Sequence, residues 1–96
     1  MAELASVEVT ISGRVTGIGF RAFVRGQAAV LGLNGYVRNL PGSKSVEVRA
    51  EGDKANLEKL VTYLKKGPPL ARVEQIDIMW SEYTGNYQDF SVRLDR

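Results

Sequence analysis

The 96-residue sequence contains no cysteine and no histidine. Without cysteine there is no disulfide framework, no thiol nucleophile and no thiolate ligand for a metal ion. Without histidine, the chain lacks the usual general base near neutral pH and the commonest zinc ligand. These two absences exclude a Ser–His–Asp triad, a Cys–His dyad and a histidine-bound catalytic zinc. Any catalysis has to use carboxylates, cations, amides, hydroxyls or backbone N–H groups.

Long hydrophobic runs are also absent. The apolar runs extend over only a few residues, whereas a transmembrane helix needs about 20. Residues 1–6 lack the basic and then apolar pattern of a signal peptide, which predicts a cytoplasmic protein. Apolar residues make up 44% of the chain and charged residues 25%, as in an ordinary globular protein. Because this length supports one core, we expect a single domain over residues 1–96.

Acidic residues are missing from a long central stretch. The 38 residues between Glu8 and Glu47 contain no carboxylate but carry five cations, namely Arg14, Arg21, Arg25, Arg38 and Lys44. A basic segment of this kind indicates either an anionic partner or a solvated surface, and charge alone does not separate the two. Apart from Arg21, these cations are interpreted as solvated surface charges that contribute to the general electrostatic field and bind no particular ligand.

The pattern of apolar residues predicts the secondary structure. Alternation of apolar and polar residues, with turn residues between the segments, predicts strands at 7–12, 36–39, 46–51, 73–80 and 90–94. A helix that ends at Gly32 is predicted from the helical spacing of Phe20, Val24, Ala28 and Leu31. A second helix, ended by residues 67–69, is predicted from an N-cap at Asp53 and an apolar stripe at Leu57, Leu60, Val61 and Leu64.

This order of elements is βαββαβ with a short extra strand. One polar face on the alternating strands implies a mostly antiparallel sheet that has both helices packed on the other face. The fold class is therefore α+β, with a ferredoxin-like sandwich as the expected architecture. The apolar stripe of residues 57–64 and Trp80 are expected in the core.

A glycine-rich segment joins the first strand to the first helix. Glycines at 13, 17 and 19 allow a sharp turn in which successive amides face one point, next to the N-terminus of the helix. Arg21 lies in the first helical turn, where a cation opposes the helix dipole, and this makes sense if it meets a bound oxyanion. No Lys-Ser/Thr follows the glycines, as a Walker A loop requires, and the chain is too short for a dinucleotide-binding fold. A glycine-rich turn without a ligand is the alternative.

Two segments together resemble the paired signature of the acylphosphatases. They are residues 13–21, GRVTGIGFR, and residues 35–39, GYVRN. The resemblance extends over nearly the whole chain, from Ser6 to Leu94. It implies a ferredoxin-like enzyme that hydrolyses small acyl phosphates to a carboxylate and inorganic phosphate, with phosphate also acting as an inhibitor.

The same resemblance implies roles for particular residues. It places the phosphate-binding arginine at Arg21 and the water-orienting asparagine at Asn39. It places the phosphate-binding loop on Val15, Thr16, Gly17, Ile18, Gly19 and Phe20. Thr16 stands where the family usually has glutamine, and the hairpin after Asn39 is about one residue longer than usual, which could shift the end of that strand.

This chemistry suits a chain without histidine. An acyl phosphate carries a good leaving group, so hydrolysis needs a positioned water and neutralised phosphate oxygens, with no general acid, metal or cofactor demanded. The expected partner is a small-molecule substrate, without nucleic acid or membrane, and the expected state is a monomer. Two alternatives stay open, a non-catalytic phosphate-binding module and an RNA-binding module, although the strand at 46–51 lacks the aromatic residues of RNA readers.

Overall fold

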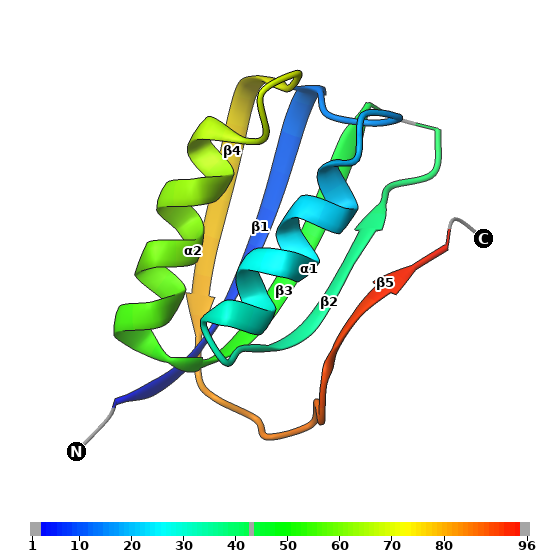
Figure 1. Ribbon diagram of the computed structural model, residues 1–96. Helices are drawn as coiled ribbons and strands as arrows, with labels where there is room; N and C mark the ends of the chain where they lie inside the picture. Colours follow the sequence, from blue (N-terminus) through cyan, green and yellow to red (C-terminus); the bar gives the residue numbers. More distant parts are fainter. Residues whose placement is uncertain (1–2, 43, 95–96) are drawn as a thin grey trace.

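The computed structural model describes residues 3–42 and 44–94, which form two helices and five strands (Figure 1). Along the chain these are β1 (Leu4–Arg14), α1 (Phe20–Val30), β2 (Asn34–Asn39), β3 (Ser45–Asp53), α2 (Lys54–Lys66), β4 (Arg72–Ser81) and β5 (Phe90–Arg93). Every predicted element is present, and the bounds differ by at most three residues. Among the described residues, no helix is long and apolar enough to cross a membrane.

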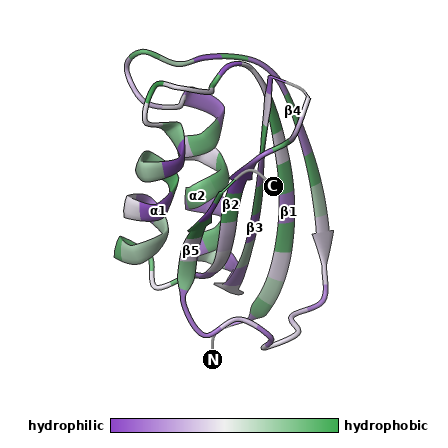
Figure 2. Ribbon diagram, turned by 90° about the vertical axis from the view of Figure 1, so that its right-hand side faces the viewer, coloured by the Kyte–Doolittle hydropathy of each residue, from purple (hydrophilic) through white to green (hydrophobic). Residues whose placement is uncertain are grey.

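The five strands form one sheet in the order β4-β1-β3-β2-β5. The pairs β1/β3, β1/β4 and β2/β3 are antiparallel, whereas β5 runs parallel to β2 at the edge. Both helices cover the same face of this sheet (Figure 2). The predicted ferredoxin-like sandwich is therefore confirmed, and the short extra strand is β5.

The core lies between the sheet and the two helices. Val7, Val9 and Ile11 project from β1 toward the helices and are completely buried. Leu57 and Leu60 meet them from α2 and are equally buried, as the predicted stripe requires. Each such side chain contributes roughly 1.5–3 kcal/mol relative to an exposed position, so these alternating residues fix which face of the sheet the helices cover.

The predicted cap of α2 is confirmed. The Asp53 carboxylate accepts a hydrogen bond from the backbone N–H of Ala55 at 2.9 Å. At the other end, Gly67 has a φ of 71° and its N–H donates to the carbonyl of Tyr63 at 2.8 Å. An N-cap carboxylate and a terminal glycine satisfy backbone groups that a helix cannot satisfy by itself, which explains both ends.

The prediction that Trp80 is a core residue is wrong, because its side chain is 41% exposed. Trp80 faces the helix side, opposite Val7 of β1, as the alternation indicated. However, β4 is an edge strand, and α2 packs mainly over β1 and β3. The ring is partly covered by Lys54, whose ammonium lies 5.8 Å from its centroid. The alternation of residues thus identified the face of the sheet on which Trp80 lies, but not how far the helices cover its side chain.

A buried carboxylate holds the connection between β4 and β5 against the open face of the sheet. Glu51 is only 2% exposed. Its Oε2 accepts hydrogen bonds from the N–H of Thr84 at 3.0 Å and the hydroxyl of Thr84 at 2.7 Å, and its Oε1 accepts one from the N–H of Gly85 at 3.0 Å. Burial disfavours the charged form, but these hydrogen bonds outweigh it and hold the pKa of Glu51 below its ordinary value.

We expect Glu51→Gln to lower the free energy of unfolding at pH 7 by about 1–3 kcal/mol, because an amide nitrogen cannot accept the bonds from Thr84 and Gly85. A lowered folded-state pKa stabilises the protein above the unfolded-state pKa, and this contribution is lost as the pH falls through the folded-state value. The difference between wild type and variant should therefore shrink from pH 7 to pH 3 in urea unfolding. A constant difference, or the same loss in the exposed control Glu58→Gln, would contradict this role of Glu51.

Candidate active site

The glycine loop, residues 15–19, connects the end of β1 to the start of α1. Gly17 and Gly19 have φ values of 70° and 80°, in the left-handed region that glycine adopts without strain. Gly19 is the N-cap of α1, and no side chain caps the helix there. The first amides of a helix have no partner within it, so the loop presents N–H groups and the positive end of the helix dipole at one place.

The loop borders a small cavity of about 240 Å³, in which the sequence-predicted residues meet. Four predicted loop residues line it, together with both predicted catalytic side chains, Ala22, one residue of β5 and the residue that follows β5: Val15, Gly17, Gly19, Phe20, Arg21, Ala22, Asn39, Val92 and Leu94. The structure thus brings a cation, an amide and a glycine-rich backbone to one depression. That combination can hold a tetrahedral anion and a water molecule next to it.

Two predicted loop residues do not line this cavity. Thr16 lines a larger cavity of about 620 Å³ on the other side of the loop. The side chain of Ile18 is half-buried and packs against the hydrophobic core. Any contact that these two residues make with a ligand in the small cavity would therefore come from their backbone.

Arg21 lies in the first turn of α1, and its side chain reaches the end of β5. Its Nη1 donates a hydrogen bond to the carbonyl of Arg93 at 3.3 Å. The guanidinium of Arg93 lies 3.9 Å from the centroid of the Tyr36 ring, which fixes that end of β5 against β2. Within residues 3–42 and 44–94, the two ion pairs found are Arg38–Glu47 and Lys54–Glu3, so Arg21 keeps its charge available for a ligand.

Asn39 is the last residue of β2, and its side chain is half-buried at the edge of the small cavity. It stands opposite Val46 of β3 in the antiparallel ladder. The next residue, Leu40, donates its N–H to the carbonyl of Ser45 at 2.9 Å. The longer hairpin therefore leaves Asn39 within the strand. Ser43, in this hairpin, lies outside the described residues.

Arg38, in the basic segment, is bound within the protein. Its Nε donates to Oε1 of Glu47 at 2.8 Å, and the Tyr36 hydroxyl donates to the same oxygen at 2.9 Å. Burial disfavours the charged carboxylate, but the hydrogen bonds from Arg38 and Tyr36 lower the pKa of Glu47 overall. Burial and Glu47 raise the pKa of Tyr36 to about 12. These groups stabilise the contact between β2 and β3 and leave Arg21 as the cation of the small cavity.

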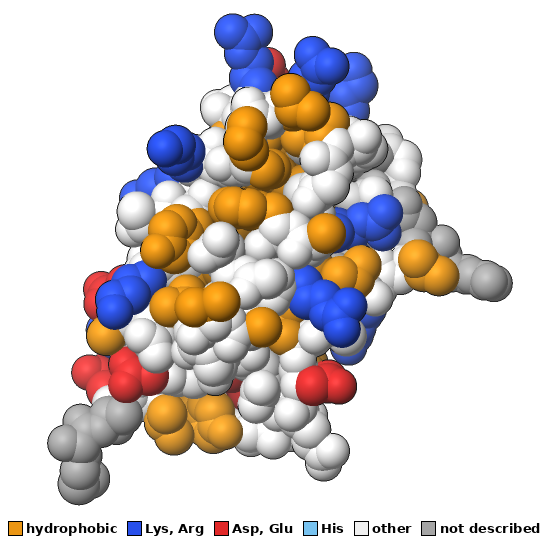
Figure 3. All heavy atoms as spheres, viewed as in Figure 1, with side chains coloured by type: hydrophobic (Ala, Val, Ile, Leu, Met, Phe, Trp, Pro, Cys, Tyr) orange, Lys and Arg blue, Asp and Glu red, His pale blue; other side chains and the backbone are white. Residues whose placement is uncertain are grey.

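Sequence reasoning missed the contribution of β5 to the site. Val92 and Leu94 form one wall of the small cavity, and the carbonyl of Arg93 positions Arg21. The alternation of residues 90–94 indicated a strand, but nothing local indicates that this strand pairs with β2. In the helix-side view, most acidic side chains lie in the lower half, whereas basic side chains are spread from the upper end to the middle of the molecule (Figure 3). Among the described residues, no group of three or more Asp or Glu is placed to hold a metal ion.

A family model, curated relatives and solved structures name the same family for proteins similar to this chain. A family model described as Acylphosphatase matches residues 7–92. A protein named Acylphosphatase from Anaeromyxobacter sp. (strain Fw109-5) is 44% identical over 93 residues, which is 97% of this chain and 99% of that protein. One from Thermus thermophilus is 51% identical over 75 residues, or 78% and 84% of the two chains. The structure of an acylphosphatase from Coxiella burnetii is similar with a TM-score of 0.87 and 37% identity, covering 94% of this chain and 93% of that one.

Proposed function

The chain belongs to the acylphosphatase family and hydrolyses the carboxyl–phosphate bond of acyl phosphates, and we propose that the reaction takes place in the small cavity beside the glycine loop. The observation that supports this location is the meeting of loop glycines, Arg21 and Asn39 around one cavity of about 240 Å³. Three other cavities, which lie beside Glu74, Tyr63 and Trp80, contain neither of these two side chains.

In this proposal, the loop and Arg21 bind the phosphoryl group. Backbone N–H groups of residues 15–20 and of the first turn of α1 donate to its oxygens, and the helix dipole favours the negative charge. The guanidinium of Arg21 donates two further hydrogen bonds from its planar fork. The carbonyl of Arg93 holds one nitrogen of that fork, which leaves the others directed to the ligand. These groups neutralise charge that spreads over the equatorial oxygens in the transition state.

Asn39 positions the attacking water. Its side-chain amide both donates and accepts, so it can hold a water molecule in one orientation next to the phosphorus. The water oxygen forms a bond to phosphorus, and the bond from phosphorus to the acyl oxygen breaks. The electron pair leaves with the carboxylate, and a phosphate oxygen of the substrate accepts the proton of the water. The products are a carboxylate and inorganic phosphate, and no protein side chain has to ionise.

Apolar side chains complete the cavity. Val15 and Phe20 are fully or nearly fully buried, and Val92 of β5 and the more exposed Leu94 just after it line the opposite side. The buried side chains of Val15 and Phe20 limit bulk water on their side of the phosphoryl group, which strengthens the interactions of the anion with Arg21 and the loop amides. The site is complete within one chain, which supports a monomer as the active form. The lack of cysteine fits a cytoplasmic location.

The direct test is release of inorganic phosphate from acetyl phosphate or benzoyl phosphate, with a phosphate monoester as the control substrate. We expect rapid release from the acyl phosphates and almost none from the monoester, because the proposed site supplies no general acid for a poor leaving group. Added inorganic phosphate should inhibit competitively. Equal rates with the two substrate types would contradict the proposed site.

We expect a metal chelator to leave the rate unchanged, because the loop amides and Arg21 would supply the charge stabilisation that Mg²⁺ supplies in other phosphoryl transfers. The measurement is benzoyl phosphate hydrolysis after dialysis against EDTA, followed by assay with and without Mg²⁺. Loss of activity that Mg²⁺ restores would overturn the metal-free mechanism.

A further inference from the structure

Tyr36 lies on the face of the sheet that the helices leave open (Figure 2). Val37, the next residue of β2, is buried in the core on the helix side, so the alternation of the strand places Tyr36 on the opposite side. The hydroxyl of Tyr36 donates to Oε1 of Glu47 at 2.9 Å. Arg38 donates to the same oxygen at 2.8 Å and holds this carboxylate in place. The half-buried Tyr36 ring therefore has a fixed position, although it does not line the small cavity.

The side chain of Arg93 lies on the Tyr36 ring. Its Cζ is 3.9 Å from the centroid of the ring. A guanidinium over the face of a tyrosine ring is attracted by the negative charge of that face. Arg93 is in register with Arg38 of β2, and Tyr36 is in register with Ser91 of β5. The contact therefore ties the end of β5 to β2 on the open face of the sheet.

The backbone of Arg93 faces the proposed active site. Its carbonyl accepts the hydrogen bond from Nη1 of Arg21 at 3.3 Å, and the preceding residue, Val92, lines the small cavity. Arg21 belongs to α1, on the helix side of the sheet. One residue at the edge of the sheet thus contacts Tyr36 through its side chain and Arg21 through its backbone.

β5 has few other attachments at this end. It is a strand of four residues at the edge of the sheet, and β2 is its neighbour in the strand order. Its start is held by the buried side chain of Phe90 and by a hydrogen bond of 2.8 Å from the N–H of Gly35 to the carbonyl of Asp89. An edge strand with one partner opens locally more easily than the core. The position of the Arg93 carbonyl therefore depends on the contact with Tyr36.

We propose that Tyr36 is a positioning residue for Arg21 and acts through Arg93 from the opposite face of the sheet. This inference rests on the proposed function, in which Arg21 binds the phosphoryl group. When the contact between Tyr36 and Arg93 is lost, the end of β5 leaves its place in a fraction of the molecules. In these molecules no carbonyl directs the guanidinium of Arg21 to the anion. The apparent affinity for the anion falls with the fraction that remains ordered.

The first test removes the ring. We expect Tyr36→Leu to raise the inhibition constant of inorganic phosphate by about 2- to 10-fold, which corresponds to the free energy of a partly exposed cation–π contact. The kcat/KM for benzoyl phosphate should fall to a similar extent. Tyr36→Phe keeps the ring and loses only the hydroxyl, so it should restore most of the affinity. Tyr63→Leu is the matched control, because it removes a partly exposed tyrosine ring from α2, and it should leave both quantities unchanged.

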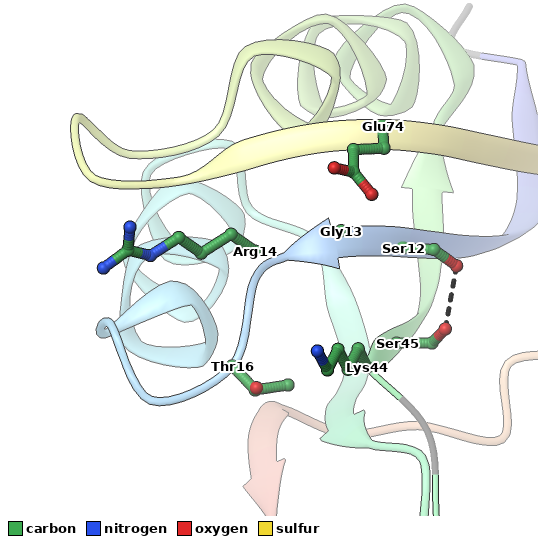
Figure 4. Close-up of a pocket in the computed structure, with 7 residues that line it drawn as sticks. All are labelled: Ser12, Gly13, Arg14, Thr16, Lys44, Ser45 and Glu74. Carbon is green, nitrogen blue, oxygen red and sulfur yellow. Dashed lines mark hydrogen bonds between the residues drawn. The ribbon is translucent and has the colours of Figure 1, made fainter.

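The second test removes the guanidinium and keeps the carbonyl. Arg93 is exposed, so Arg93→Gln should fold like the wild type. It should weaken phosphate binding as much as Tyr36→Leu, and the double variant should show no further loss, because both changes break one contact. Arg14→Gln is the control for charge. It removes the same charge from an exposed residue of the larger cavity, on the other side of the loop (Figure 4), and should leave the inhibition constant unchanged.

A third comparison separates positioning from a merely structural role. In the background of Arg21→Gln, Tyr36→Leu should not weaken phosphate binding further, because the group that Tyr36 positions is gone. Additional loss in that background, an unchanged inhibition constant in Arg93→Gln, or an equal loss in Tyr63→Leu or Arg14→Gln would overturn the role of Tyr36 while the proposed function stands. Unchanged phosphate affinity in Arg21→Gln alone would instead overturn the proposed function of Arg21.

Discussion

Arg21→Gln is expected to weaken the binding of inorganic phosphate by about 10- to 150-fold, since loss of a charge-assisted hydrogen bond costs about 1.5–3 kcal/mol. Glutamine retains a donor but loses the charge and the planar fork. If Arg21 also stabilises the charge that develops in the transition state, kcat falls in addition. The measurements are the inhibition constant of phosphate and the kcat and KM for benzoyl phosphate, all on one preparation.

The fold should survive this substitution, because the only internal hydrogen bond described for the Arg21 side chain is the one to the carbonyl of Arg93. A melting temperature close to that of the wild type would confirm this. Arg25→Gln is the matched control, because it removes the same charge one turn further along α1 from an exposed residue that lines neither cavity. Unchanged phosphate affinity in Arg21→Gln, or equal weakening in Arg25→Gln, would show that Arg21 does not bind the phosphoryl group.

The elements of this fold could be predicted because their signals are local. The alternation in β1 and the apolar stripe of α2 depend on spacing within one segment. The N-cap at Asp53 depends only on this residue and the helical pattern that directly follows it. The glycines of the loop are equally local, since the left-handed φ values at Gly17 and Gly19 require that residue type. Arg21 could be proposed from the glycine segment itself, whereas Asn39 could be proposed only from the resemblance of residues 35–39 to the family signature.

The parts that could not be predicted depend on contacts between segments far apart in the sequence. Nothing in residues 90–94 specifies parallel pairing with β2, and the wall formed by Val92 and Leu94 follows from that pairing. The exposure of Trp80 follows from the position of β4 at the edge, where the helix layer ends. Likewise, the sequence places Thr16 in the loop. That Thr16 lines the larger cavity follows from the contact between the hairpin and β1, which the sequence does not show.

Asn39→Ala is expected to lower kcat by about 10²–10³, the size of effect seen when one preorganised polar group is removed from a transition state. In the proposed mechanism, Asn39 contacts the attacking water and not the bound anion. The inhibition constant of phosphate should therefore change little, because Arg21 and the loop amides still hold the anion. A loss in kcat without a loss in phosphate affinity identifies an interaction that exists mainly on the path to the transition state.

The alternative is that Asn39 serves only to end β2 and begin the hairpin. That role predicts a lower melting temperature with kcat nearly intact. Asn34→Ala is the matched control for it, because Asn34 begins the same strand and its side-chain amide donates to the carbonyl of Tyr87 at 3.2 Å, far from both cavities. We expect Asn34→Ala to lower stability without lowering kcat, and Asn39→Ala to do the reverse. Near-normal kcat in Asn39→Ala would show that Asn39 does not position the water and that another group at the rim of the small cavity does.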